Sequence, residues 1–261
     1  MFQQIANRAR HAAKSVALVG SLGLMVAGVL VPLAGFKNAA TTTCALTDTQ
    51  CVVTFGNARI AERESALSTL NSHVTKLFSA GRISSADNTA LVADISSNES
   101  GLTALKGQLD AAPDAKTARA DVKLIYTQFR IFAVVLPRDY HEVWMDAIAH
   151  IDARLKGSET IIQDAINGAP ESVQGRAKTL FSDYQSQVST AEAQTDAAQG
   201  IIGQLTPANF NASPTAYASQ FGSYKTDIQT AGADTKQAVS DLHQIYLLLK
   251  SAGVATPTPA A

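Results

Sequence analysis

The chain has 261 residues, enough for one or two domains with a hydrophobic core. Charged residues make up 16% of the sequence, and four of the 21 basic residues but none of the 22 acidic residues lie in residues 1–40. The remainder therefore has a net charge of −5. This balance argues against nucleic acid or an anionic lipid surface as a partner, because both need clustered lysine and arginine.

An uncharged apolar segment at residues 15–36 follows Arg8, Arg10 and Lys14. Positive charge before such a segment is typical of an export signal, and about 20 apolar residues can span a bilayer as a helix. No position near its end matches a small-residue cleavage site well. Residues 1–35 are therefore predicted to be either a cleaved signal peptide or a retained single-pass anchor. In both cases the rest of the chain lies outside the cytoplasm.

Two cysteines, Cys44 and Cys51, are the only ones in the sequence and lie just beyond the apolar segment, in CALTDTQC. Outside the cytoplasm such a pair is expected to oxidise. The spacing differs from the C-x-x-C of redox-active pairs, and further metal ligands are not nearby. The sequence therefore predicts a structural disulfide that ties the apolar segment to the body.

From Asn57 onward, apolar residues recur every three or four positions, which is typical of helices that bury one face. The first helix is expected to end at Ala80–Gly81, and Ser84 or Ser85 can cap the second. No segment of comparable length alternates with period two, so strands are not predicted.

The third helix is expected to run unbroken over residues 118–136 and to kink or restart at Pro137. A fourth helix is expected at 138–167, and two more flank the longest internal loop, Thr206–Pro214. The predicted organisation is a linker at 36–56, a helical unit with a connector helix at 57–168, a second helical unit at 169–252 and a disordered tail at 253–261.

One stretch occurs twice: DAKTARADVKLIY at residues 114–126 and DTKQAVSDLHQIY at 234–246 agree at six of thirteen positions. A duplicated unit of three helices, at about 57–136 and 171–251, would explain the match. Helices built from alanine, lysine, aspartate and apolar residues also resemble each other by composition alone. Both explanations are consistent with the sequence.

The strings SGLTALKGQLDA, ARADVKLIYTQFRIFAVVLPR and TKQAVSDLHQIY resemble a loose group of exported bacterial helical proteins with ARADLK-like repeats. The resemblance covers most of the body, although Gln128-Phe129-Arg130 departs from the tyrosine–arginine motif that precedes a proline in that group. The group has no established activity, so the resemblance implies a helical fold and an extracytoplasmic location.

Only one set of side chains offers a candidate metal site. Glu142, Asp146 and His150 are spaced i, i+4, i+8 on one helix face and could bind a divalent cation if other helices contributed ligands. The same pattern arises on any solvated helix face, which is the interpretation we favour. The preceding HEVWM is not a zinc helix, because Met145 stands where a second histidine is needed.

Arg130 and Arg138 bracket the apolar run FAVVLP, either as a partner-binding elbow or as side chains that keep the ends of a buried run in solvent. No nucleophile elbow, phosphate-binding loop or dinucleotide motif is present. We therefore predict no catalytic residue and no cofactor.

These observations predict an all-α protein, built as an elongated helical bundle or antiparallel coiled-coil hairpins. Its expected role is non-enzymatic: a spacer, scaffold or adhesion module of the cell envelope or surface. The alternative is an extracytoplasmic helical bundle that binds a small ligand or a metal. The expected partners are the membrane, if the apolar segment is retained, and another protein or a second copy of the chain, with no nucleic acid.

Overall fold

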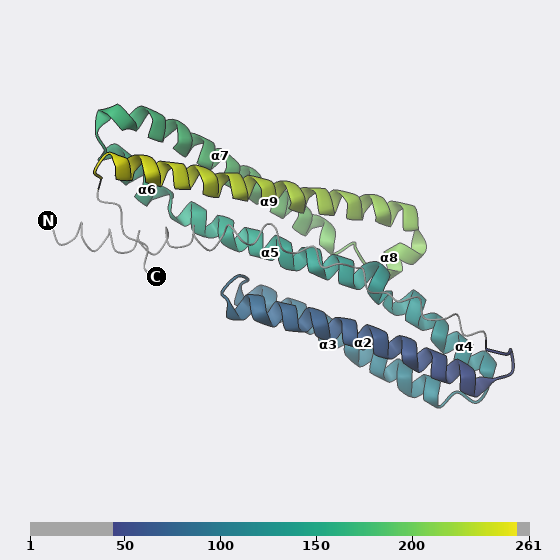
Figure 1. Ribbon diagram of the computed structural model, residues 1–261. Helices are drawn as coiled ribbons and strands as arrows, with labels where there is room; N and C mark the ends of the chain where they lie inside the picture. Colours follow the sequence, from purple (N-terminus) through teal and green to yellow (C-terminus); the bar gives the residue numbers. More distant parts are fainter. Residues whose placement is uncertain (1–43, 255–261) are drawn as a thin grey trace. The chain divides into compact units, whose positions relative to one another are not determined.

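The computed structural model describes residues 44–254, which are almost entirely helical (Figure 1). In chain order they form α2 (Thr49–Ser79), α3 (Ser85–Asp110), α4 (Ala115–Leu124), the π-helices η1 (Ile125–Phe129) and η2 (Ile131–Val135), α5 (Leu136–Gly157), α6 (Glu159–Asn167), α7 (Glu171–Ile202), α8 (Pro207–Ala212) and α9 (Pro214–Ser251). This part of the chain contains no strand. The predicted all-α class is confirmed.

The predicted signal peptide or anchor at residues 1–35 lies outside the described residues, as does most of the predicted tail. Within residues 44–254, no helix combines the length and the apolar content that a membrane span requires. The predicted linker at 36–56 extends too far, because α2 already begins at Thr49.

The chain divides into two compact units. The described part of the N-terminal unit is residues 44–147 and 198–226, and that of the C-terminal unit is residues 148–197 and 227–254. This division does not coincide with the predicted boundary at 168/169, because α5, α7 and α9 each contribute residues to both units.

The N-terminal unit is built on the hairpin of α2 and α3, which pack side by side (Figure 1). Its turn has Gly81 at φ 63°, and Ser84 caps α3 through a capping box in which Ser84 and Asp87 bond each other's backbone N–H groups. The end of α2 near Gly81 and the cap of α3 at Ser84 both agree with the sequence prediction. The core of the unit is apolar and contains Ile60, Leu67, Leu70, Val74, Leu91, Ile95, Leu102, Leu105, Leu109, Ile125 and Ile131, among others.

The disulfide between Cys44 and Cys51 is present and closes a loop onto the first turn of α2. Asp48 caps that helix by accepting a hydrogen bond from the Cys51 N–H at 2.9 Å. Arg119 of α4 donates to the carbonyl oxygens of Cys44 at 3.3 Å and Ala45 at 2.6 Å. The loop is therefore tied to α4 as well as to α2.

The predicted unbroken helix at 118–136 is wrong in one respect, since the chain leaves helical geometry at Arg130, which has φ 44° and ψ 39°. Pro137 lies in the first turn of α5, which begins at Leu136. A proline is tolerated there because the first N–H groups of a helix have no intrahelical acceptor. The restart expected at Pro137 is therefore found, but the break comes seven residues earlier.

In the C-terminal unit, the end of α5, α6, residues 171–197 of α7 and residues 227–251 of α9 surround a second core. This core contains Leu155, Ile162, Ile166, Ala177, Phe181, Tyr184, Val188, Ala238, Leu242, Ile245 and Leu249. The buried Tyr184 hydroxyl donates to the Leu155 carbonyl at 2.5 Å. The helix predicted at 138–167 is interrupted at Ser158, whose hydroxyl bonds the Arg154 carbonyl at 2.9 Å.

The two copies of the repeated stretch have different structural contexts. Asp114 is the N-cap of α4, where its side chain accepts from the Thr117 N–H at 2.7 Å. Asp234 lies inside the 38-residue helix α9, with no break before it. The second half of the chain therefore lacks the helix start that a duplicated three-helix unit requires, and the structure gives no support to duplication of that element.

Gly56 and Gly107 provide a matched test of packing in the N-terminal unit. A Cβ at Gly56 would overlap the side chains of Leu109 and Val122, whereas one at Gly107 would meet nothing within 4 Å. We expect Gly56→Ala to lower the free energy of unfolding by about 1–3 kcal/mol through overpacking. Gly107→Ala should raise it by up to about 1 kcal/mol through helix propensity. Urea denaturation of both variants measures this, and a Gly56→Ala protein as stable as the parent would contradict the close contact.

Candidate functional site

Arg130 is the most unusual backbone position in the described chain. It is the only residue other than glycine with positive φ among residues 44–254, and a π-helix lies on each side of it. A left-handed conformation is unfavourable for a residue with a Cβ, and both it and π-helical turns are often found at functional positions. The chain therefore stores strain at the junction between η1 and η2.

The short helix α8 holds this junction in place (Figure 1). The Arg130 Nε donates to the Asn211 Oδ1 at 2.5 Å, and the guanidinium lies 4.3 Å from the centroid of the Phe210 ring. The Asn211 Nδ2 donates to the Thr127 carbonyl at 2.6 Å. One asparagine thus satisfies both the arginine and a backbone acceptor next to the helix break.

On the α2 side, the buried Arg63 contacts the residues that flank the junction. Its guanidinium lies 4.8 Å from the centroid of the Tyr126 ring and 4.9 Å from that of Phe132, and it donates to the Arg59 carbonyl at 2.8 Å. Burial lowers the pKa of Arg63, although Tyr126 and Glu62 oppose the shift. The junction is therefore held by side chains from both α2 and α8.

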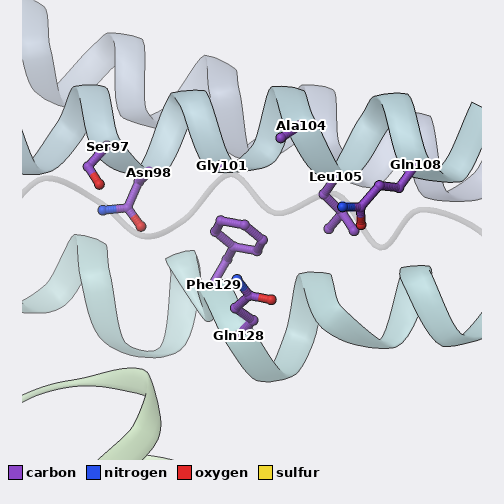
Figure 2. Close-up of a pocket in the computed structure, with 8 residues that line it drawn as sticks. All are labelled: Ser97, Asn98, Gly101, Ala104, Leu105, Gln108, Gln128 and Phe129. Atoms are coloured by element: carbon purple, nitrogen blue, oxygen red, sulfur yellow. The ribbon is translucent and has the colours of Figure 1, made fainter.

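A pocket with a volume of about 390 Å³ lies between α3 and η1, beside the junction (Figure 2). Its lining contains amide, hydroxyl and apolar side chains and no ionisable one: Ser97, Asn98, Gly101, Ala104, Leu105, Gln108, Gln128 and Phe129. In Figure 2 the Phe129 ring points from η1 toward Gly101 of α3. A Cβ at Gly101 would lie 2.5 Å from the Phe129 Cε1, so the glycine makes room for the ring.

A polar network of ionisable side chains lies elsewhere in the N-terminal unit, between α3 and α5. Arg138 donates to Asp94 at 2.5 Å and to Asp139 at 2.7 Å, and Asp139 is fully buried. Its second oxygen, Oδ2, has no hydrogen-bond partner among the described residues. Arg138 is therefore an internal ion-pair partner and not a free solvating side chain.

The three weak metal-ligand candidates do not come together as a site, and their partly buried positions also contradict the solvated helix face favoured from the sequence. Burial raises the pKa of Glu142 to about 6, with Arg138 opposing the shift, and it raises that of Asp146 to about 8. Neighbouring carboxylates add to both shifts. Within residues 44–254, no group of three or more histidine, cysteine, aspartate or glutamate side chains is arranged to hold a metal ion. Helical spacing placed Glu142, Asp146 and His150 on one face of α5, but no other helix completes a coordination shell.

His141 makes packing and hydrogen-bond contacts inside the N-terminal unit. Its Nδ1 donates to the Pro137 carbonyl at 2.7 Å, and its ring packs edge-on against Phe221 with centroids 5.4 Å apart. Tyr224 and Trp144 also lie within 6.4 Å of it, measured between ring centroids. Burial lowers its pKa, while the bond to Pro137 opposes the shift. The histidine therefore joins α5 to the start of α9 within the N-terminal unit.

The C-terminal unit contains one fully buried carboxylate, Asp152. Its Oδ1 accepts a hydrogen bond from the Thr235 hydroxyl at 2.8 Å, and its Oδ2 has no partner among the described residues. Burial raises the pKa of Asp152 to about 7, with Thr235 opposing the shift. This carboxylate therefore joins α5 to α9 within the C-terminal unit.

The sequence did not indicate the pocket or the role of Asp152. Phe129 belongs to an uninterrupted series of apolar residues that are three or four positions apart, which predicts burial in a helical core. Gln128 belongs to no motif that would indicate a binding site. Asp152 lies between Ile151 and Leu155 on the predicted buried stripe, which was the one available signal of its burial.

No protein-family model, curated protein or solved structure matches this chain. The resemblance to exported bacterial helical proteins therefore stays a prediction.

Proposed function

We propose that the chain is a non-enzymatic, exported helical protein of the cell envelope or surface that acts as a spacer, scaffold or interaction module. The observation that supports this role is the location of its ionisable groups. Arg138, Asp139 and Asp152 bond partners inside the helical units, while the pocket beside Arg130 is lined by no group able to transfer a proton. Such a pocket can bind a molecule but lacks a general acid or base.

Export is supported by the apolar segment and by the disulfide that follows it. Cys44 and Cys51 form a disulfide. Disulfides persist in oxidising compartments and are rare in the cytosol. The 31 residues of α2, at about 1.5 Å per residue, make a rod of roughly 46 Å, which suits a spacer.

Cell fractionation combined with intact mass tests this proposal. We expect the protein in an extracytoplasmic fraction, with cysteines that resist alkylation until a reductant is added. A mass that includes residues 1–40 would identify a retained anchor, whereas a soluble product that begins near Phe36 or Thr43 would identify a cleaved signal. A cytoplasmic protein with two freely alkylated thiols would contradict export.

A second candidate function, the binding of a small ligand outside the cytoplasm, is favoured by the pocket itself. Its volume of about 390 Å³ falls at the lower end of the roughly 300–1,000 Å³ range of small-molecule sites. The two functions are compatible, because a spacer can carry a ligand site on one of its helical faces.

A further inference from the structure

We propose that the pocket between α3 and η1 binds a neutral saccharide of one or two rings. The inference rests on the second proposed function, ligand binding, and specifies the ligand. Its basis is the chemistry of the lining: three carboxamides and one hydroxyl surround an apolar patch, with no charged side chain (Figure 2).

The carboxamides match the hydroxyl groups of a sugar. A side-chain amide offers both donors and acceptors, and so does each sugar hydroxyl. Gln108 and Gln128 are exposed, and their side-chain amides bond no other residue among residues 44–254. The Asn98 Nδ2 donates to the Asp94 carbonyl at 2.9 Å, which leaves its Oδ1 as an acceptor with no bond in the described chain. These groups are available to a bound polar molecule.

The apolar part of the lining matches the C–H face of a sugar ring. Leu105, Ala104 and Gly101 provide it on α3, and Phe129 provides it on η1. No residue that lines the pocket carries a charge that could pair with a phosphate, a carboxylate or an amine, and this favours a neutral ligand.

A peptide fits this pocket less well than a saccharide. Peptide recognition along an edge uses backbone N–H and C=O groups of the receptor. The walls here are helices and offer no extended strand edge for such pairing. The lining side chains therefore provide the groups that recognise the ligand.

The junction at Arg130 fixes the wall that carries Gln128 and Phe129. Asn211 accepts a hydrogen bond from Arg130 and donates one to the Thr127 carbonyl, and these two bonds hold the last turn of η1. Gly101 leaves space for the Phe129 ring. A wall held in this way loses little conformational entropy when a ligand binds. The contacts that hold the strained junction at Arg130 therefore also fix one wall of the pocket.

The test is isothermal titration of the purified full-length protein with the neutral disaccharide N,N′-diacetylchitobiose. We expect binding with a Kd on the order of 0.1–1 mM and a rise in Tm at saturating sugar. Gln128→Ala should weaken binding about fivefold, the effect of one hydrogen bond. Ala104→Trp, a large side chain at an exposed position of α3 that lines the pocket, should abolish it.

The matched control is Gln229→Ala, an exposed glutamine of α9 that does not line the pocket, and it should bind like the parent. Circular dichroism and Tm in the absence of sugar check that each variant is folded. The proposal is overturned if N,N′-diacetylchitobiose does not bind at 10-fold above the expected Kd range, if Ala104→Trp binds it normally, or if an alanine–glutamine–alanine tripeptide with an acetylated N-terminus and an amidated C-terminus binds in its place. None of these results changes the fractionation result, so failure of saccharide binding is distinguishable from failure of export.

Discussion

Replacing Arg138 with methionine should lower the free energy of unfolding by about 2–3 kcal/mol at pH 8, because the buried Asp139 loses its cationic partner and keeps a proton that the wild-type carboxyl has released by that pH. Asp139 is fully buried and makes its ion pair with Arg138 at 2.7 Å. Methionine fills a similar apolar volume, so no cavity is expected. The decrease in the free energy of unfolding therefore measures the effect of the unpaired carboxyl group. Urea denaturation at fixed pH gives the difference.

The decrease in the free energy of unfolding caused by Arg138→Met should become smaller as the pH falls. Burial raises the pKa of Asp139 to about 7 even with Arg138 present, and without the arginine the pKa will lie higher still. Below that value the variant buries a neutral acid, so the loss at pH 5 should be only about 1 kcal/mol, from the half-exposed pair with Asp94. A loss that is constant from pH 5 to pH 8 would show that packing, and not charge, is responsible.

The matched control is the double variant Arg138→Met with Asp139→Asn, which removes both charges. It should recover at least about 2 kcal/mol of the loss at pH 8, and a double-mutant cycle with Asp139→Asn alone isolates the coupling. A double variant as unstable as Arg138→Met would contradict the ion-pair explanation.

The helices were predictable because their signals are local. The apolar stripe of α2 recurs at Ile60, Leu67, Leu70 and Val74, all of which are fully buried. The end of α2 and the cap of α3 depend on Gly81 and Ser84, and both act within one turn of the chain. The Cys44–Cys51 pair is separated by only seven residues, so its pairing also followed from the sequence.

The junction and the pocket were not predictable, because they depend on contacts between distant segments. Arg130 has a positive φ, and its Nε–H donates to Asn211, which lies 81 residues later in the sequence. The pocket joins residues of α3 to Gln128 and Phe129 of η1, and the unbroken apolar pattern through 118–136 contains no sign of the break. For Glu142, Asp146 and His150 the local spacing suggested a site, but within residues 44–254 no other helix supplies ligands to complete it.

Replacing Asp152 with asparagine should stabilise the protein above neutral pH. The native pKa of Asp152 is raised to about 7 by burial, while an unfolded aspartate titrates near 3.9. Between these values the unfolded state releases a proton that the native state retains, so stability falls as the pH rises and the full penalty applies above about pH 7. Asparagine is nearly isosteric, keeps an acceptor oxygen for the Thr235 hydroxyl and carries no charge.

The expected gain for Asp152→Asn is about 2–4 kcal/mol at pH 8 and close to zero at pH 4, where the wild-type carboxyl is neutral in the native state. Thermal and urea denaturation across this pH range measure it, with Asp164→Asn at an exposed position of α6 as the control that should show no such trend. Because Thr235 and Asp152 join α9 to α5 inside the C-terminal unit, a gain that appears only above neutral pH would identify this buried carboxylate as a pH-dependent weak point of that unit. A variant that is less stable than the parent at pH 8 would instead show that the ionised carboxylate makes a favourable bond in the native state.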